Sequence, residues 1–289
     1  MRLCPRCGKP WSDRGVETCE FCGYLTEKIG GYLAFAPELA EQCEGFEAAY
    51  FKTLSQLEAN SFWFNARNQL LTWALPHYFP GASNFLEIGC GTGFVLSGIA
   101  SAFPDLAVSG SEVFTAGLEI AAQRVPQAEL FQMDARHIPF ADHFTVIGAF
   151  DVLEHIQEDE QVLSQMYQAV RSGGGIMVTV PQHRFLWSKS DEYAHHVRRY
   201  RAGELRRKAE KAGFEVLRLT SFVSLLLPFM LLARLKQRRT PEFNPTTEFE
   251  IPSVVNRLLG NAMLVERATI RAGISFPAGG SLLLVATKP

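Results

Sequence analysis

Residues 85–94 constrain the fold more than any other part of this 289-residue chain. They read Phe-Leu-Glu-Ile-Gly-Cys-Gly-Thr-Gly-Phe, an apolar strand that meets three glycines at alternate positions before a helix. Glycine permits positive φ angles and lets a ligand approach the backbone closely. The N–H groups that begin the next helix can bind a carboxylate or a phosphate. A tight turn alone needs fewer glycines, so the segment predicts a ligand-binding strand–turn–helix unit.

Strands and helices alternate around this unit. We predict strands at residues 84–88, 106–110, 129–133, 145–150, 175–180, 215–220 and 281–287, and helices at 94–103, 116–124, 159–171 and 202–212. Such alternation is typical of a parallel sheet covered by helices. Apolar residues at helical spacing precede the sheet from Gly45 onward, and Pro76 and Pro80 are expected to end that region. Residues 222–280 look largely helical around a proline-rich loop at 240–252.

The glycine spacing separates several kinds of nucleotide site. Gly89, Gly91 and Gly93 give G-x-G-x-G, whereas a dinucleotide fingerprint would place its third glycine at Phe94. No Lys-Ser or Lys-Thr pair follows the turn, which excludes a P-loop. Glu112, at the end of the next strand, can accept the ribose hydroxyls of NAD or of S-adenosylmethionine (SAM). These residues therefore indicate an adenosine-type ligand without choosing between the two.

Further segments resemble class I SAM-dependent methyltransferases, in the branch that includes quinone-biosynthesis enzymes. The segments, spread over residues 45–289, are Glu87-x-Gly-x-Gly-x-Gly93, Gln132-Met-Asp-Ala135, Phe150-Asp-Val-Leu-Glu-His-Ile156, Arg171-Ser-Gly-Gly-Gly175, Phe62-Trp-Phe-x-x-Arg67 and His196-x-Arg-Arg-Tyr200. The resemblance implies a Rossmann-like, doubly wound α/β fold with a mostly parallel seven-stranded sheet and helices on both faces. Residues 222–280 would then be a helical insertion before the last strand, since a short hairpin is usual there.

The resemblance also implies SAM as cofactor and gives its contacts. Glu87 and the glycines would border the methionine moiety, Glu112 would hold the ribose, and Asp134 the adenine amino group. Arg67 either pairs with the SAM carboxylate or covers the domain as a surface charge. The implied cofactor-binding set is Arg67, Glu87, Gly89, Cys90, Gly91, Gly93, Glu112, Val113, Asp134, Ala135, Asp151 and Val152.

Histidines follow the fourth and fifth strands, at the sheet edge where ligands bind in such folds. His155 borders the expected SAM methyl group and is the predicted catalytic base; a solvated or helix-capping histidine is the alternative. His183, His195 and His196 lie in the next loop with Asp191. The adjacent His195 and His196 would point to opposite faces of a strand, which argues against a metal site there.

Two C-x-x-C-G motifs stand at the N-terminus: Cys4-Pro-Arg-Cys7-Gly8 and Cys19-Glu-Phe-Cys22-Gly23. Paired turns of this kind deliver four thiolates to tetrahedral zinc. Unligated thiols and a redox dithiol are the alternatives, although the βαβ setting usual for a redox dithiol is absent. We predict a zinc ribbon at 1–27, a linker at 28–44 and a methyltransferase domain at 45–289. The ribbon either only folds itself or also contacts a partner, and Cys43 is read as a plain thiol.

Charge and hydropathy restrict location and partners. The formal net charge of −2 argues against a broad nucleic-acid surface. No signal-like apolar core opens the chain, and the apolar run 222–235 is shorter than the roughly 20 residues of a membrane span. We therefore expect a cytoplasmic protein. The run ends at Lys236, Arg238 and Arg239, which suits either a buried helix capped by cations or a peripheral membrane contact.

Four functions remain open at this point. The first is a SAM-dependent methyltransferase that methylates oxygen or carbon of a small or lipid-like acceptor. The second is an rRNA or tRNA methyltransferase that uses the ribbon to recognise RNA. The third is a non-enzymatic SAM-binding scaffold, and the fourth an NAD-dependent reductase. The sequence does not reveal the oligomeric state.

Overall fold

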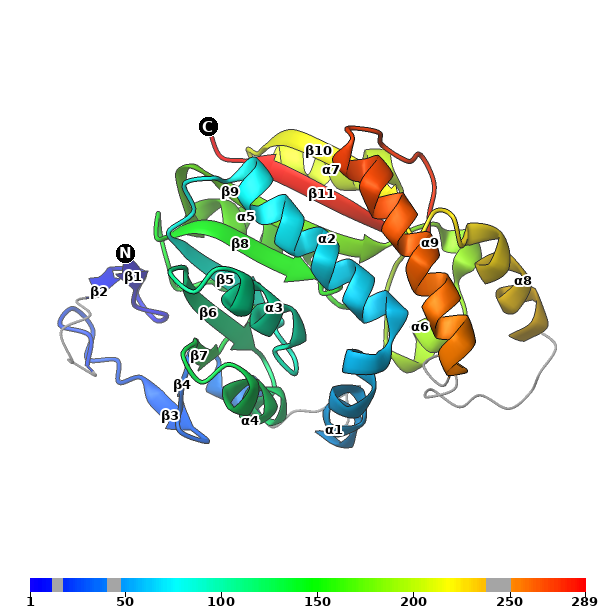
Figure 1. Cartoon of the computed structure of the whole chain (residues 1–289). Coiled ribbons are helices and arrows are strands. Elements are labelled where there is room, and N and C mark those ends of the chain that lie inside the picture. Colours follow the sequence, from blue (N-terminus) through cyan, green and yellow to red (C-terminus); the bar gives the residue numbers. More distant parts are fainter. Residues whose placement is uncertain (12–17, 41–47, 238–250) are drawn as a thin grey trace.

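The computed structural model describes residues 1–11, 18–40, 48–237 and 251–289. Its centre is a nine-stranded sheet in the order β10-β11-β9-β8-β5-β6-β7-β4-β3 (Figure 1). The strands are β3 (Glu27–Ile29), β4 (Tyr32–Ala34), β5 (Asn84–Ile88), β6 (Ala107–Glu112), β7 (Glu129–Gln132), β8 (Phe144–Phe150), β9 (Val170–Pro181), β10 (Glu215–Phe222) and β11 (Ser281–Thr287). Pairing is parallel from β4 to β9 and antiparallel where β11 joins β9 and β10 and where β3 joins β4.

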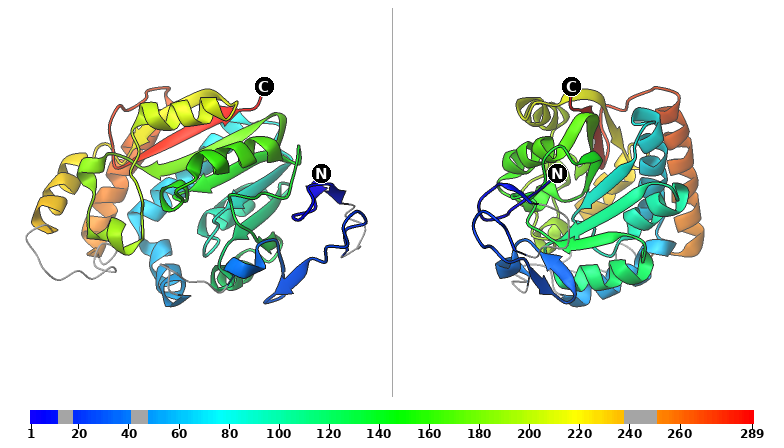
Figure 2. Two further views of the ribbon diagram at one scale, coloured as in Figure 1. Left: turned by 180° about the vertical axis from the view of Figure 1, so that it is seen from behind. Right: turned by 90° about the vertical axis from the view of Figure 1, so that its left-hand side faces the viewer.

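Helices cover both faces of the sheet (Figure 2). They are α1 (Ala48–Leu57), α2 (Phe62–Tyr78), α3 (Phe94–Ala102), α4 (Thr115–Arg124), α5 (Asp159–Ala169), α6 (Lys189–Tyr193), α7 (Ala202–Lys211), α8 (Leu227–Gln237) and α9 (Ser253–Arg271). Side chains alternate across β5: Phe85 packs with α2, α3 and α9, whereas Leu86 and Ile88 pack in the cluster that contains α5 and α7. The doubly wound architecture is thus confirmed.

The sheet has nine strands instead of the predicted seven, because the segment predicted as a linker is partly strand. Leu33 and Ala34 of β4 pair in parallel with Phe131 and Gln132 of β7. The Gln132 side chain continues this pairing, since it accepts from the Ala36 N–H (3.0 Å) and donates to the Ala36 carbonyl (2.7 Å). Three-residue strands are too short to show a two-residue alternation, so they could not be predicted from the sequence. Residues 41–44 of the expected linker, Cys43 included, lie outside the described residues.

All seven predicted strands and four predicted helices are present, with ends shifted by a few residues. The exceptions are instructive. Helix α2 continues through Pro76 to Tyr78 instead of ending at the proline. The cost of proline there is limited to the last turn, where few helical hydrogen bonds remain to be lost. Strand β9 begins at Val170, so the glycine-rich segment after Arg171 belongs to the strand and forms its irregular start.

The helical insertion before the last strand consists of α8 and α9, and the residues 238–250 between them lie outside the described part. Helix α9 packs along α2. Its buried Glu266 accepts hydrogen bonds from the backbone N–H groups of Val223, Ser224 and Leu225, at 2.5, 2.6 and 2.8 Å. These bonds fix the chain between β10 and α8 to α9. No helix within the described ranges has the length and hydrophobicity that crossing a membrane requires.

The N-terminal segment packs against the sheet domain through its first residues. Strands β1 (Arg2–Leu3) and β2 (Pro10–Trp11) form a two-stranded sheet. The Leu3 N–H donates to the Pro139 carbonyl at 2.8 Å. The Arg2 guanidinium lies 4.8 Å from the ring centroids of both Trp11 and Phe35. The cysteine-rich unit is therefore anchored beside β7 and β4.

Candidate active site

A cavity of about 1240 Å³ opens at the carboxyl ends of β5, β6, β7 and β8. The strand order changes direction at β5, because β6 and β8 lie on its two sides, and ligands of open α/β sheets bind at such a point. The predicted cofactor residues that line the cavity are Arg67, Glu87, Gly89, Cys90, Gly91, Glu112, Val113, Asp134, Ala135, Asp151 and Val152. Gly93 does not line it.

The glycine turn brings its backbone close to other parts of the site. Gly89 has φ +64°, and a Cβ there would lie 2.5 Å from a γ-methyl of Val152. Gly93 has φ +72° and begins α3, where a Cβ would lie 3.0 Å from the Cβ of Ala121. Gly89 thus lets the loop after β8 approach the turn, whereas Gly93 serves helix packing behind it. From the sequence, both glycines were expected to contact the ligand.

Glu112 ties the turn to the end of β6. One carboxylate oxygen accepts from the Gly91 N–H (3.1 Å), and the other from the N–H groups of Val113 (2.8 Å) and Phe114 (3.4 Å). Burial raises its pKa, against the effect of these hydrogen bonds. A carboxylate oxygen accepts more than one hydrogen bond, so Glu112 can also accept from a ribose diol in the cavity.

Asp134 follows β7 and is held by Arg136. Its carboxylate accepts from the Arg136 backbone N–H (2.9 Å) and from the Arg136 Nε (3.0 and 3.1 Å). Burial works to raise the pKa of Asp134, but the Arg136 bonds outweigh it and leave the pKa lowered. An ionised Asp134 beside the buried Ala135 gives this end of the cavity an acceptor next to an apolar wall.

Arg67 is only 7% exposed, which rules out the alternative interpretation that it is a surface charge. Its guanidinium forms an ion pair with Asp151 and lies 4.5 Å from the ring centroid of Trp63. Asp151 adopts φ +58°, which is uncommon outside glycine and typical of constrained functional positions. Glu87 is 2% exposed, and its Oε2 has no hydrogen-bond partner within the described residues. Burial raises the pKa of Glu87 to about 8, although Arg67 lies near enough to lower it.

A cluster of polar side chains forms the opposite wall of the cavity. His155 ends a short 3₁₀ turn, Leu153–His155, after β8. Its ring contacts the His196 ring edge-on, with centroids 4.7 Å apart. Burial, followed by the proximity of His196, lowers the pKa of His155 to about 3. His155 therefore lines the cavity, and its lowered pKa favours the neutral imidazole.

Asp191 organises the loop around His196. Its carboxylate accepts from His196 Nδ1 (2.9 Å) and from Arg199 Nε and Nη2 (2.7 and 3.0 Å). These bonds lower its pKa despite its burial. His195 is exposed at the rim and His183 stacks on Phe185, so the structure selects His196 from the three loop histidines.

Several residues of the site were not predicted from the sequence. Glu58 accepts from Thr92 Oγ1 (2.6 Å) and Arg124 Nη1 (2.8 Å), which clamps the glycine turn to the segment after α1. Glu154 lies in the cavity wall with no exposed surface. Its position next to His155, in the segment Leu153–His155, was the one sequence feature that could have identified it as a site residue. The insertion also lines the cavity, with Phe229, Met230, Ala233, Arg234, Ile251 and Leu259.

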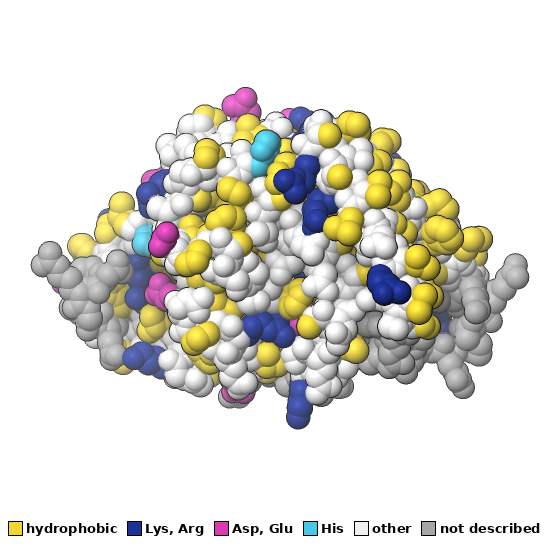
Figure 3. Space-filling view, viewed as in Figure 1, with side chains coloured by type: hydrophobic (Ala, Val, Ile, Leu, Met, Phe, Trp, Pro, Cys, Tyr) yellow, Lys and Arg dark blue, Asp and Glu magenta, His cyan; other side chains and the backbone are white. Residues whose placement is uncertain are grey.

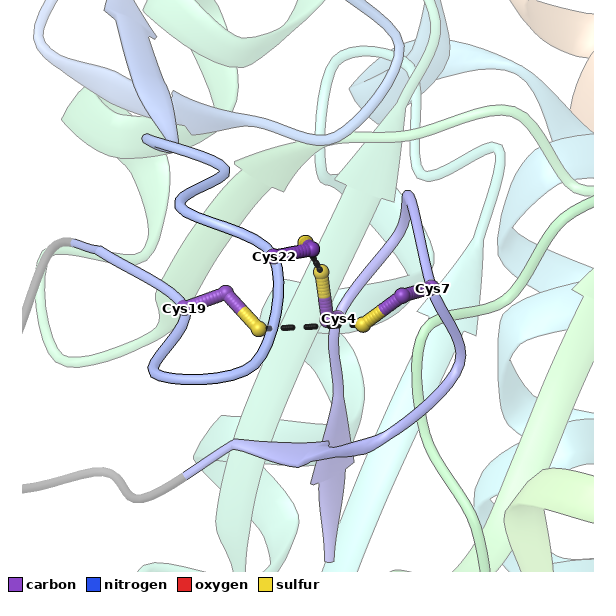
Figure 4. A group of neighbouring side chains, drawn as sticks. All are labelled: Cys4, Cys7, Cys19 and Cys22. Carbon is purple, nitrogen blue, oxygen red and sulfur yellow. Dashed lines mark hydrogen bonds between the residues drawn. The ribbon is translucent and has the colours of Figure 1, made fainter.

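The four N-terminal cysteines converge on one point (Figure 4). Cys4 and Cys22 Sγ atoms lie 3.7 Å apart, as do those of Cys7 and Cys19, and all four lie within 4.8 Å of one another. Sulfur atoms about 2.3 Å from a tetrahedral ion are separated by about 3.8 Å, which the observed pairs match. The donor set and its spacing therefore fit zinc.

Comparison with known proteins finds relatives that carry methyltransferase names. The chain is 29% identical over 171 residues to a "Probable S-adenosylmethionine-dependent methyltransferase" of Mycolicibacterium smegmatis, covering 57% of this chain and 64% of that one. It is 34% identical over 103 residues to a phosphatidylethanolamine N-methyltransferase of Cereibacter sphaeroides, covering 32% and 48%. The chain thus spans less than two thirds of these relatives' lengths.

The fold is shared with solved methyltransferases. Phosphoethanolamine N-methyltransferase 2 of Haemonchus contortus, solved with S-adenosyl-L-methionine, aligns with a TM-score of 0.57 at 20% identity, covering 90% of this chain and 61% of that one. A family model described as "Methyltransferase domain" matches residues 56–219, from the end of α1 into β10, which is more than half of the chain. The matched region contains the glycine turn, the carboxylates after β6, β7 and β8, and the histidine cluster, and the chain therefore belongs to this methyltransferase family.

Proposed function

We propose that the chain binds SAM in the cavity at the carboxyl end of the sheet and transfers its methyl group to a lipid-like acceptor. One observation carries the proposal: the cavity is polar beneath the glycine turn, whereas α8 and α9 line it mainly with apolar side chains, with Arg234 among them. Its two ends therefore suit two different molecules, a polar cofactor and an acceptor with an apolar part.

The polar end fits SAM in charge and in hydrogen-bonding groups. SAM carries a sulfonium, an ammonium, a carboxylate, a ribose diol and an adenine amino group. Arg67 is the cation available to the carboxylate, and Glu112 and Asp134 are acceptors for the diol and the amino group. Glu87 brings a buried carboxylate to the side where the ammonium would lie. Gly89 keeps the backbone near that moiety free of a side chain.

The apolar end supports an acceptor with a hydrocarbon part. Phe229 is 65% exposed on α8, and Leu258 is 63% exposed on α9. Figure 3 shows hydrophobic side chains gathered toward the end of the molecule where α8 and α9 lie. A protein that takes its acceptor from a membrane surface needs such a rim, so we include a peripheral membrane contact in the proposal.

Methyl transfer requires the acceptor atom in line with the sulfonium methyl and water excluded. Asp151 and Val152, which line the cavity, would form the floor between the two ends, and the ion pair of the buried Arg67 with the half-buried Asp151 would keep that floor rigid. His155 lines the cavity. Its lowered pKa makes it a weaker base than an ordinary histidine, and its catalytic role stays a prediction.

We further propose that Cys4, Cys7, Cys19 and Cys22 hold zinc. The segment buries little apolar surface, so the metal would supply most of its folding energy. The contacts of Arg2 and Leu3 with the sheet domain favour a role in stabilising β4 and β7 over a separate recognition role. The net charge of −2 gives no support to RNA as its partner.

Two measurements test the proposal. Calorimetry with S-adenosylhomocysteine must show one site, and Gly89→Ala must weaken binding there, with far-ultraviolet circular dichroism confirming that the variant is folded. Absence of binding by the unaltered chain would overturn the assignment of cofactor. Transfer of labelled methyl from SAM is then followed into the lipid, aqueous and RNA fractions of a cell extract. Label in the RNA fraction would favour the RNA alternative, and transfer into none would favour the scaffold.

A further inference from the structure

Glu154, His155 and His196 form a group that belongs neither to the glycine turn nor to the proposed cofactor contacts. One potential ligand atom from each lies within 4.8 Å of the other two, and all three residues line the cavity. Glu154 and His155 come from the turn after β8, whereas His196 comes from the loop after α6. The Val197 N–H joins these segments by a 2.8 Å hydrogen bond to the Glu154 carbonyl.

Glu154 is the member that most needs a further partner. It is fully buried, and neither carboxylate oxygen has a hydrogen-bond partner within the described residues. Each neighbouring carboxylate has a cation of its own, since Arg67 pairs with Asp151 and Arg199 with Asp191. A buried carboxylate without a partner is costly, and natural proteins keep such groups where a cation or a proton balances them.

Both histidines are oriented by groups outside the cluster. His196 Nδ1 is engaged by the Asp191 carboxylate at 2.9 Å, which directs its Nε2 away from Asp191. His155 has a hydrogen bond with the Ala194 backbone. In metal sites a ligating histidine almost always uses its second nitrogen in this way, on a carboxylate or on a backbone carbonyl. This cluster shows one example of each.

We propose that Glu154, His155 and His196 bind a divalent first-row transition-metal ion at the acceptor end of the cavity. Two imidazoles and one carboxylate form a donor set of open catalytic metal sites, in which the remaining positions take water or substrate. Ligand atoms about 2.1 Å from such an ion lie roughly 3.4 Å apart, so small side-chain rotations must draw the three groups together. The ion binds whether or not the proposed methyl transfer is correct.

The location gives the ion a role in the proposed function. A hydroxyl bound to a divalent cation loses its proton more readily, because the cation stabilises the negative oxygen. The proton passes to water, and the resulting oxygen attacks the sulfonium methyl, whose carbon–sulfur bond breaks to leave S-adenosylhomocysteine. An acceptor hydroxyl held in this way needs no protein base.

Cobalt is the probe that separates this site from the cysteine cluster. The full chain is stripped of metal under reducing conditions and titrated with Co²⁺ without SAM or acceptor. We expect two Co²⁺ per chain, one with intense thiolate-to-metal absorption from the cysteines and one with only weak visible bands. Saturation at one Co²⁺, all of it thiolate-bound, overturns the proposal.

Three variants assign the second ion. Glu154→Gln keeps the side-chain shape and His196→Ala removes one ligand, so each should bind one Co²⁺ with the thiolate absorption unchanged. His195→Asn is the matched control and should retain both ions, because His195 is exposed and asparagine tolerates its φ of +53°. Two ions in both Glu154→Gln and His196→Ala would refute the ligand set. S-adenosylhomocysteine binding by the cobalt-free chain, measured separately, reports on the cofactor site alone.

Discussion

Substitution of Gly89 by alanine isolates what the glycine turn contributes. Two costs are expected. A left-handed φ of +64° costs a non-glycine residue roughly 1–2 kcal/mol. The new Cβ would also lie 2.5 Å from the Val152 γ-methyl, and overpacking of this kind costs about 1–3 kcal/mol. Gly89→Ala should therefore destabilise the protein by about 2–5 kcal/mol.

Gly173 provides the matched control. It has φ +77° at the irregular start of β9, and a Cβ there would meet nothing within 4 Å. Gly173→Ala should consequently cost only the backbone term of roughly 1–2 kcal/mol. The difference between the two variants measures the close approach of the Val152 loop.

Urea denaturation followed by tryptophan fluorescence gives both free energies, and a double-mutant cycle with Val152→Ala tests the cause. We expect Val152→Ala to remove most of the clash when combined with Gly89→Ala, while Gly173→Ala stays additive with it. Calorimetry should show weaker S-adenosylhomocysteine binding for Gly89→Ala alone. Equal destabilisation by Gly89→Ala and Gly173→Ala, or strict additivity of Gly89→Ala with Val152→Ala, would refute the reasoning.

Three further predictions concern buried charge and metal. Arg67→Ala should cost about 3–5 kcal/mol in urea denaturation because it strands Asp151, whereas Arg67→Met with Asp151→Asn should cost less; equal losses would contradict the ion pair. The folded pKa of Glu87 is raised to about 8, so its neutral form is favoured by folding, and stability should fall as pH rises from about 4.5 to 8. In Glu87→Gln the melting temperature should change less over that pH range than in the unaltered protein. An equal fall of the melting temperature in both proteins would show that other groups cause the pH dependence. Cys7→Ser should release the zinc and lower the melting temperature; unchanged zinc content would exclude Cys7 as a ligand.

The local parts of this structure could be predicted from the sequence. The strand before Gly89 has apolar residues on both faces besides Glu87, and the three glycines after it predict a turn with positive φ angles. Glu112 and Asp134 could be placed because the carboxyl ends of parallel strands meet at one edge. In each case the decisive information lies within a few residues of the side chain concerned.

Other parts depend on contacts between distant segments and left no local signal. From the sequence alone, His196 could not be distinguished from His195. In the structure, Asp191, which also pairs with Arg199, holds His196 against His155. Arg67 could not be separated from a surface cation, because α2 shows apolar residues around much of its circumference. Glu154 was passed over, since a glutamate on a short turn is usually exposed and here it is enclosed by the loop carrying Val197.

The short strand β4 links the cysteine-rich unit to the cofactor end of the cavity. The Gln132 amide donates to the Ala36 carbonyl at 2.7 Å and to the Val113 carbonyl at 3.1 Å, so one side chain joins the segment after β4 to the loop after β6. Two residues beyond Gln132 stands Asp134, the acceptor proposed for adenine. The Arg2 guanidinium stacks on Phe35 from the other side. Loss of the metal would release Arg2 from Phe35 before it disturbed the core to which Phe35 belongs, and its first consequence should therefore be weaker binding of the adenosine moiety.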